Sequence, residues 1–173
     1  MNETIKNLIE RRSIRKYKSE QIKDEELNEI LKAGEYAPSG MGLQSAKIVV
    51  IQNKEIIQKL SKLNARIMGG GADPFYGAPT LIIVLADKNR NTYLEDGSLV
   101  LGNLMNAAYS LGIGSCWIHR AREEFETEEG KELLKEWNVP ENYIGIGHCI
   151  LGYPDGELPF AKKRKSDYVT IIK

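Results

Sequence analysis

The sequence predicts an α+β fold in which helices cover both sides of a single sheet, formed as one domain over residues 1–173. Patterns typical of helices and strands alternate along the chain, and no linker or change in composition separates them. Residues 80–86 are almost all apolar, as in a strand whose two faces are both covered. Residues 95–111 form the most apolar helical pattern, so we expect that helix to be central and largely buried.

The N-terminal part of the chain predicts two helices and a loop. Apolar residues at helical spacing indicate a short helix over residues 5–9, which ends in a basic cluster at residues 11–16. A second helix over residues 24–34 has the acidic first turn that a helix N-terminus favours, and it stops before Pro38. Residues 38–42 then form a glycine-containing loop.

The middle of the chain predicts a strand, a helix, a long loop and a second strand. Residues 47–51 have the length and the β-branched side chains of a buried strand. Asn53 is a suitable N-cap for a helix that extends to about residue 63. Three glycines at residues 69–71 open the longest loop, which leads into the apolar strand at residues 80–86.

The following elements are expected to complete the same sheet and its helical layers. The apolar helix over residues 95–111 ends at Gly112, a residue suited to a helix C-terminus. Residues 114–118 and 144–151 have the patterns of strands, and residues 127–137 predict an acidic surface helix.

The last part of the chain combines charge, proline and a final apolar run. Residues 155–167 are poorly suited to packing on their own chain, and residues 168–172 have the pattern of a strand. We therefore expect an arm that reaches a partner subunit.

Charge is balanced over the chain but separated along it. The sequence has 24 basic and 24 acidic side chains and a pI of about 6.8. Residues 1–18 carry six basic and two acidic side chains, whereas residues 122–141 carry three basic and eight acidic ones. This balance and the lack of a basic-aromatic face argue against a nucleic-acid binder, which the basic run at residues 162–165 would otherwise suggest.

The cysteine content and the hydropathy indicate a cytoplasmic protein. Cys116 and Cys149 are the only cysteines and lie in apolar runs, so neither a disulfide framework nor a four-cysteine cluster is expected. No apolar run approaches the roughly 18 residues of a membrane helix, and the N-terminus lacks an export signal, so we expect no membrane association.

The basic cluster at residues 11–15 is the strongest candidate for a binding site. The planar guanidinium groups of arginine suit phosphate, and Ser13 adds a neutral donor, so the cluster could hold a dianionic phosphate. A solvated helix end is the alternative interpretation. The second basic run, at residues 162–165, fits best if both clusters converge on one anion.

The usual catalytic motifs are missing. The stretches at residues 112–117 and 145–150 lack the third glycine of a dinucleotide fingerprint, and no Walker-type phosphate loop is present. His148 and Cys149 are adjacent, so on a strand they point to opposite faces and cannot both join a zinc site with Cys116. No charge near Cys116 would activate it as a nucleophile. These absences favour a protein that borrows its reactive group from a cofactor.

The order of the motifs resembles that of the nitroreductase family of flavin-dependent oxidoreductases, in particular its short members. The matches extend over nearly the whole chain. They are Arg11-Arg12-Ser13-Ile14-Arg15, Ala37-Pro38-Ser39-Gly40 with Gln44, Ala78-Pro79, Leu111-Gly112-Ile113-Gly114-Ser115-Cys116-Trp117-Ile118, Leu151-Gly152-Tyr153-Pro154 and Lys162-Lys163-Arg164.

The resemblance implies a three-layer fold, a homodimer and a bound FMN. A mixed, mainly antiparallel sheet would lie between helices, each C-terminal arm would embrace the other subunit, and FMN would sit at the subunit interface. Many relatives have Pro-Trp where this chain has Ser45-Ala46, so the packing behind the flavin would differ.

The resemblance also implies which residues bind FMN. Those after the first helix would approach the phosphate, the ribityl chain and the pyrimidine edge, and those in the arm would complete the phosphate site. Residues 38–40 would come from the second subunit and line the isoalloxazine, and residues 116–118 would run beside the ring, where a main-chain N–H can donate to flavin N5. The full set is Arg11, Arg12, Ser13, Arg15, Pro38, Ser39, Gly40, Gln44, Cys116, Trp117, Ile118, Lys162 and Arg164.

The implied activity is that of an FMN-dependent oxidoreductase. NAD(P)H would reduce the flavin at N5, and an electron-poor acceptor such as a nitroaromatic or a quinone would then take its place in a ping-pong mechanism. No side chain is implied as catalytic and no metal is required. Arg15 would stabilise negative charge near flavin N1. A flavin-binding sensor or carrier with little turnover is the alternative.

Overall fold

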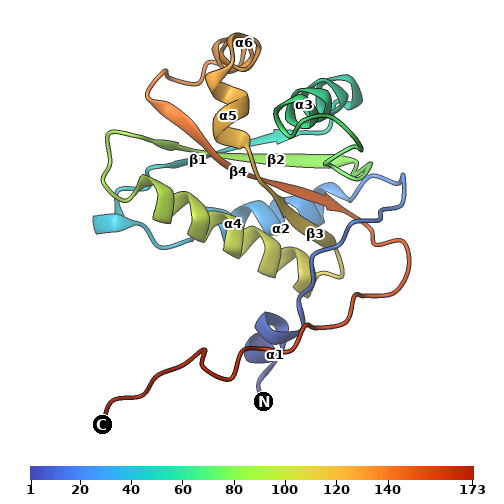
Figure 1. The fold of residues 1–173 in the computed structure, drawn as a ribbon, viewed down its shortest axis with the longest axis vertical. Helices are drawn as coiled ribbons and strands as arrows, with labels where there is room; N and C mark the ends of the chain where they lie inside the picture. Colours follow the sequence, from blue (N-terminus) through green and yellow to red (C-terminus); the bar gives the residue numbers. More distant parts are fainter.

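A four-stranded antiparallel sheet separates two helical layers in the computed structural model, which describes residues 1–173 (Figure 1). The strands follow the order β1-β2-β4-β3 and comprise β1 (Ala46–Ile51), β2 (Thr80–Asp87), β3 (Gly114–Ile118) and β4 (Tyr143–Gly152). The helices are α1 (Glu3–Glu10), α2 (Asp24–Glu35), α3 (Lys54–Ile67), α4 (Tyr93–Ser110), α5 (Ala121–Glu126) and α6 (Glu128–Glu136), with a 3-10 turn at Gly40–Gly42. This arrangement confirms the predicted α+β fold.

The apolar strand β2 lies at the centre of the molecule and is buried on both faces, as predicted. Leu81, Ile83 and Leu85 contribute to the core beneath α3, α5 and α6. Ile82, Val84 and Ala86 contribute to the core that α2 and α4 cover. Fully burying an aliphatic side chain of this size contributes roughly 1.5–3 kcal/mol, so this one strand anchors both layers.

Local sequence signals set several helix ends. The Asn53 side chain accepts a hydrogen bond from the Ile56 N–H at 3.0 Å and starts α3. The Thr127 side chain accepts from the Gly130 N–H at 3.0 Å and starts α6. Gly112, with a φ of 74°, follows the end of α4. These three residues confirm the predicted boundaries.

Burial differs from expectation at β1 and α4. Only Ile51 of β1 is buried, because β1 is the edge strand and pairs with β2 alone. Helix α4 starts at Tyr93, and its Leu94 and Leu99 are exposed, because they face away from the sheet. A further helix, α5, was not predicted and follows the left-handed residue Arg120.

None of the helices has a stretch suited to crossing a bilayer.

The two ends of the chain bury little of their apolar surface. Helix α1 has no buried residue, and Ile5, Leu8 and Ile9 are all exposed. Residues 156–173 are exposed throughout and form neither helix nor strand. The predicted strand at 168–172 is therefore wrong for the single chain, because no strand of that chain lies alongside it.

Candidate functional site

The arginine segment, residues 11–15, lies along the outer edge of β3. Ser13 forms a parallel bridge with Ser115, the only parallel contact at this sheet, and the Ile14 N–H donates to the Ser115 carbonyl oxygen at 2.9 Å. The Tyr17 hydroxyl donates to the Ile14 carbonyl oxygen at 2.7 Å. Burial raises the pKa of Tyr17, so this hydroxyl keeps its proton. Backbone contacts and the half-buried Tyr17 hold the segment against β3.

Arg11 and Arg12 use their guanidinium groups differently. Arg12 Nη1 donates to the carbonyl oxygens of Ile9 and Arg11, both at 2.8 Å, and so closes the end of α1. Arg11 Nη1 is buried and has no hydrogen-bond partner in the chain. An unpaired buried charged donor is unfavourable, so this position favours a bound anion.

A cavity of about 230 Å³ opens beside β3 and the arginine segment. Arg15 and Trp117 are among its lining residues. Cys116 and Ile118 border it, but their side chains are buried in the core beneath α3 and α5, so they offer the cavity mainly backbone. Strand residues direct their N–H groups to alternate sides, so Trp117 directs its N–H to the same open edge as Ser115.

Two further residues support this cavity and were not selected from the sequence. Arg120 lines it, and its Nε donates to Asn64 Oδ1 at 2.9 Å. Asn64 is fully buried, and its Nδ2 donates to the His119 carbonyl oxygen at 2.9 Å. Asn64 thus fixes the chain as it leaves β3. The available signal was a single amide on the otherwise apolar buried face of α3.

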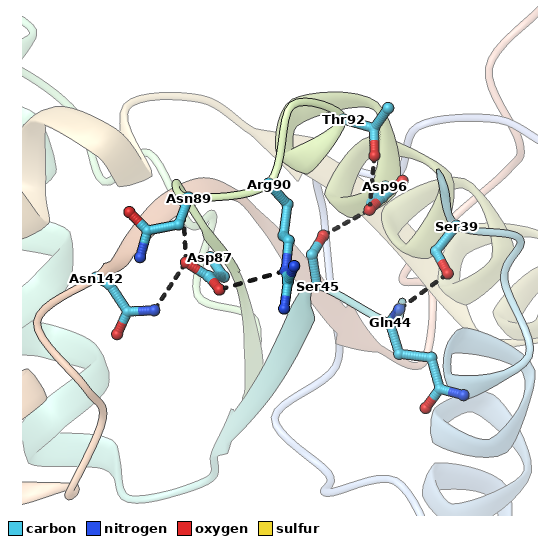
Figure 2. Close-up of polar contacts among 9 residues, drawn as sticks. All are labelled: Ser39, Gln44, Ser45, Asp87, Asn89, Arg90, Thr92, Asp96 and Asn142. Atoms are coloured by element: carbon cyan, nitrogen blue, oxygen red, sulfur yellow. Dashed lines mark hydrogen bonds and ion pairs between the residues drawn. The ribbon is translucent and has the colours of Figure 1, made fainter. Parts of the chain in front are cut away.

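Residues 38–45, called here the 38–45 loop, lie at the start of α4, away from the arginine segment. The Gln44 N–H donates to Ser39 Oγ at 3.0 Å (Figure 2), and the Gly40 N–H donates to Asp96 Oδ1 at 2.9 Å. A Cβ at Gly40 would lie 2.2 Å from Thr92 Oγ1, so only glycine fits this approach. Pro38, Ser39 and Gln44 line a second cavity of about 320 Å³.

Within one chain the two groups of predicted residues remain apart. The 38–45 loop is hydrogen-bonded to Asp96 at the N-terminal end of α4. Strand β3 and the arginine segment paired with it lie at the C-terminal end of the same helix (Figure 1). Helix α4 has 18 residues. It is therefore about 27 Å long. The two cavities share no lining residue.

The C-terminal arm starts beside the arginine segment and then leaves the body of the molecule. The Asp155 N–H donates to the Lys16 carbonyl oxygen at 3.0 Å, and the two side chains form an ion pair at 2.8 Å. Lys162 and Arg164 are exposed and make no hydrogen bond or ion pair within the chain. The expected convergence of the two basic clusters is therefore not formed in the isolated subunit.

Behind β3 lies a fully buried pair, Glu124 and His148. His148 Nε2 lies 2.7 Å from Glu124 Oε2, and neither side chain is exposed to solvent. His148 Nδ1 lies 3.3 Å from the Ile118 carbonyl oxygen. Cys149 points to the opposite core, where burial raises the pKa of its thiol. His148 is thus engaged with Glu124 and β3, and the two adjacent side chains cannot share a metal.

Known proteins resemble this chain in sequence and in fold over nearly its whole length. A nitroreductase of Bacteroides fragilis, solved with bound FMN, has a TM-score of 0.90 and is 33% identical, and each chain is covered completely. An Archaeoglobus fulgidus protein provisionally named an NADH dehydrogenase/NAD(P)H nitroreductase is 34% identical over 92% of this chain and 90% of its own. The FMN reductase [NAD(P)H] of Bacillus subtilis is 30% identical over 89% of this chain and 67% of its own. The nitroreductase family model matches residues 8–69 and 65–153, and the chain belongs to the nitroreductase family.

Proposed function

We propose that this chain is an FMN-dependent NAD(P)H oxidoreductase that reduces electron-poor acceptors such as nitroaromatics and quinones. The observation that carries the proposal is Arg11, whose buried Nη1 lacks a partner at the edge of β3. A relative with the same fold over its full length binds FMN. When bound, FMN supplies the redox chemistry, because it accepts hydride from NAD(P)H and passes the electrons on to the acceptor.

The arginine segment provides the charge that an FMN would need. Arg11 would pair with the phosphate, because one nitrogen of its guanidinium has no partner in the chain and a guanidinium and a phosphate compensate each other's charge. Ser13 and Arg15 would approach the ribityl chain and the pyrimidine edge, where the Arg15 cation stabilises negative charge electrostatically. Arg12 would act mainly by closing α1 and so fixing the start of the segment.

The β3 edge would contribute backbone rather than side chains. The Trp117 N–H faces the open edge and is suited to donate to flavin N5. The buried side chains of Cys116 and Ile118 anchor the strand beside it. No side chain of the chain needs to form a covalent bond in this proposal.

The rest of the site would come from a second subunit of a homodimer. Pro38, Ser39, Gly40 and Gln44 lie at the far end of α4, so in this proposal they line the flavin of the partner. The exposed apolar residues of α1 and the exposed arm provide surface for such a dimer. Lys162 and Arg164 of the arm would complete the phosphate site.

The proposed setting is the cytoplasm, with residues 1–173 as one domain. Both cysteines are free and buried, which suits a reducing compartment. The cavity beside β3 is lined partly by Trp117 and Tyr76, and aromatic side chains suit planar, electron-poor acceptors.

The absorption spectrum of the purified protein tests the proposal. We expect a yellow protein whose flavin absorbance is bleached by NADH or NADPH without oxygen and restored by a quinone or a nitroaromatic. A colourless protein that cannot be reconstituted with FMN would contradict the proposal. A yellow protein that neither nucleotide reduces would instead support the flavin sensor or carrier.

A further inference from the structure

Asp96 accepts three hydrogen bonds, two of them from the 38–45 loop and one from Thr92 at the start of its own helix. Figure 2 shows the bonds from Ser45 and Thr92. Asp96 Oδ1 accepts from the Gly40 N–H at 2.9 Å. Its Oδ2 accepts from Ser45 Oγ at 2.6 Å and from Thr92 Oγ1 at 3.2 Å. Asp96 itself is 3% exposed and sits in the first turn of α4. The Asp96 side chain therefore binds the loop on both sides of its tip and connects it to α4.

The loop needs such a tie because its own conformation is unfavourable. Met41 and Gln44 have φ values of 52° and 50°, in the left-handed region that residues other than glycine avoid. Met41 is 91% exposed, so the tip gains no stability from burial. Within the loop, the Gln44 N–H donates to Ser39 Oγ at 3.0 Å, and two backbone hydrogen bonds close the 3-10 turn at its tip.

The carboxylate is suited to this role by its charge as well as its position. Burial alone would raise the pKa of Asp96, but hydrogen bonds from Ser45, Gly40 and Thr92 outweigh burial and hold that pKa below its ordinary value. No basic side chain forms an ion pair with Asp96. Neutral donors and the N-terminal end of α4 therefore compensate a charge that is present at neutral pH.

We infer that Asp96 is a positioning residue that holds the 38–45 loop in the shape required for its half of the cofactor site. Asp96 does not line the cavity beside β3, but it borders the second cavity together with Ser39 and Gln44. Its hydrogen bonds go to Gly40 and Ser45, so it acts on the cofactor site through the shape of the loop. This inference rests on the proposed function, because the loop has a cofactor to position only if FMN is bound.

The same region offers a matched control in Asp87. Its Oδ1 accepts from the Asn89 N–H at 3.0 Å and from Asn142 Nδ2 at 2.7 Å, which joins the end of β2 to the start of β4 (Figure 2). Its backbone N–H donates to the Ser45 carbonyl oxygen, and a side-chain substitution retains that bond. Asp87 is thus a hydrogen-bonded carboxylate next to the loop, but its side chain does not hold the loop.

The experiment compares Asp96→Ala, Asp96→Asn and Asp87→Ala in the full-length protein. Hydrogen exchange of the 38–45 loop is measured without FMN, and the FMN dissociation constant is measured by fluorescence titration of the folded protein. For Asp96→Ala we expect faster exchange confined to the loop and a dissociation constant raised roughly tenfold or more. Asp96→Asn should restore part of the slow exchange and part of the FMN affinity, because its amide oxygen can still accept from the Gly40 N–H.

The possible outcomes separate this inference from the proposed function. If Asp96→Ala matches Asp87→Ala in loop exchange, or if it frees the loop without weakening FMN, the inference is overturned. A lower melting temperature with unchanged FMN affinity would also overturn it, because it would show a purely structural role. If the wild-type protein does not bind FMN at all, the proposed function fails, while the exchange measurement still decides whether Asp96 holds the loop.

Discussion

The arginine segment and the 38–45 loop are held in place by different means. The arginine segment is fixed by backbone pairing with β3 and by the half-buried Tyr17, and a guanidinium nitrogen of Arg11 is left without a partner. The loop is fixed by the side chain of Asp96, and its tip is strained and exposed. The first region therefore offers charge on a rigid support, whereas the second depends on one carboxylate.

The largest expected effect comes from removing the C-terminal arm after Gly156. We expect the shortened chain to keep its fold, because residues 156–173 are exposed throughout. We expect the shortened chain to lose dimerisation and most FMN binding, because the arginine segment of one subunit would no longer meet the 38–45 loop of the other. Analytical ultracentrifugation and flavin content measure the two losses. A shortened chain that remains dimeric and yellow would show that the arm is not needed to join the half-sites.

The support behind β3 is tested by Glu124→Ala. Removing one partner of a fully buried pair leaves the other uncompensated, and we expect the free energy of unfolding to fall by about 3–5 kcal/mol. Chemical denaturation measures this change. Glu126→Ala, which removes an exposed ion pair with Arg122, is the control and should leave stability nearly unchanged. Equal effects would mean that the buried pair does not support β3.

Arg11→Ala and Arg12→Ala distinguish the two adjacent arginines. Losing a charge-assisted contact to phosphate should raise the FMN dissociation constant roughly 10- to 150-fold for Arg11→Ala. Arg12→Ala should act mainly on α1, because Arg12 Nη1 already serves two backbone carbonyls. Fluorescence titration gives both constants. If the two variants weaken FMN equally, the separate roles assigned to these arginines are wrong.

The smallest expected effect is a change in the pH dependence of stability. The pKa of Asp96 lies below its ordinary value in the folded protein, so its contribution to stability is complete above the unfolded pKa of about 4 and is lost as the pH falls through the folded pKa. The stability difference between wild type and Asp96→Asn should therefore narrow at acid pH. Urea unfolding from pH 7 to pH 3 measures it. A constant difference would argue against a charged Asp96.

The fold could be predicted from the sequence where local signals determine it. The apolar run of β2, the Asn53 cap of α3 and the glycine after α4 depend on residues close in sequence. The exposure of β1 could not be predicted, because the edge position depends on how the strands are ordered. The pattern at residues 168–172 predicted a strand, but strand pairing requires a neighbour that the single chain does not provide.

The candidate site was predicted only in part for the same reason. The basic cluster at residues 11–15 is contiguous, so composition identified it. The contacts between Asn64 and Arg120 and between Gly40 and Asp96 join residues 56 positions apart. Such pairs appear only when the fold is known. Asp96 was not selected from the sequence, because an acidic residue in the first turn of a helix is common and nothing nearby in the sequence connects it to Gly40.

Mixing two defective subunits tests the central claim that each site combines the arginine segment of one subunit with the 38–45 loop of the other. A heterodimer of an Arg11→Ala subunit and an Asp96→Ala subunit, purified with two different tags, then contains one doubly altered site and one site free of substitutions. We predict one FMN per heterodimer, bound with wild-type affinity. If every site in the heterodimer binds FMN as weakly as the single variants do, both regions act within one subunit and the account is contradicted.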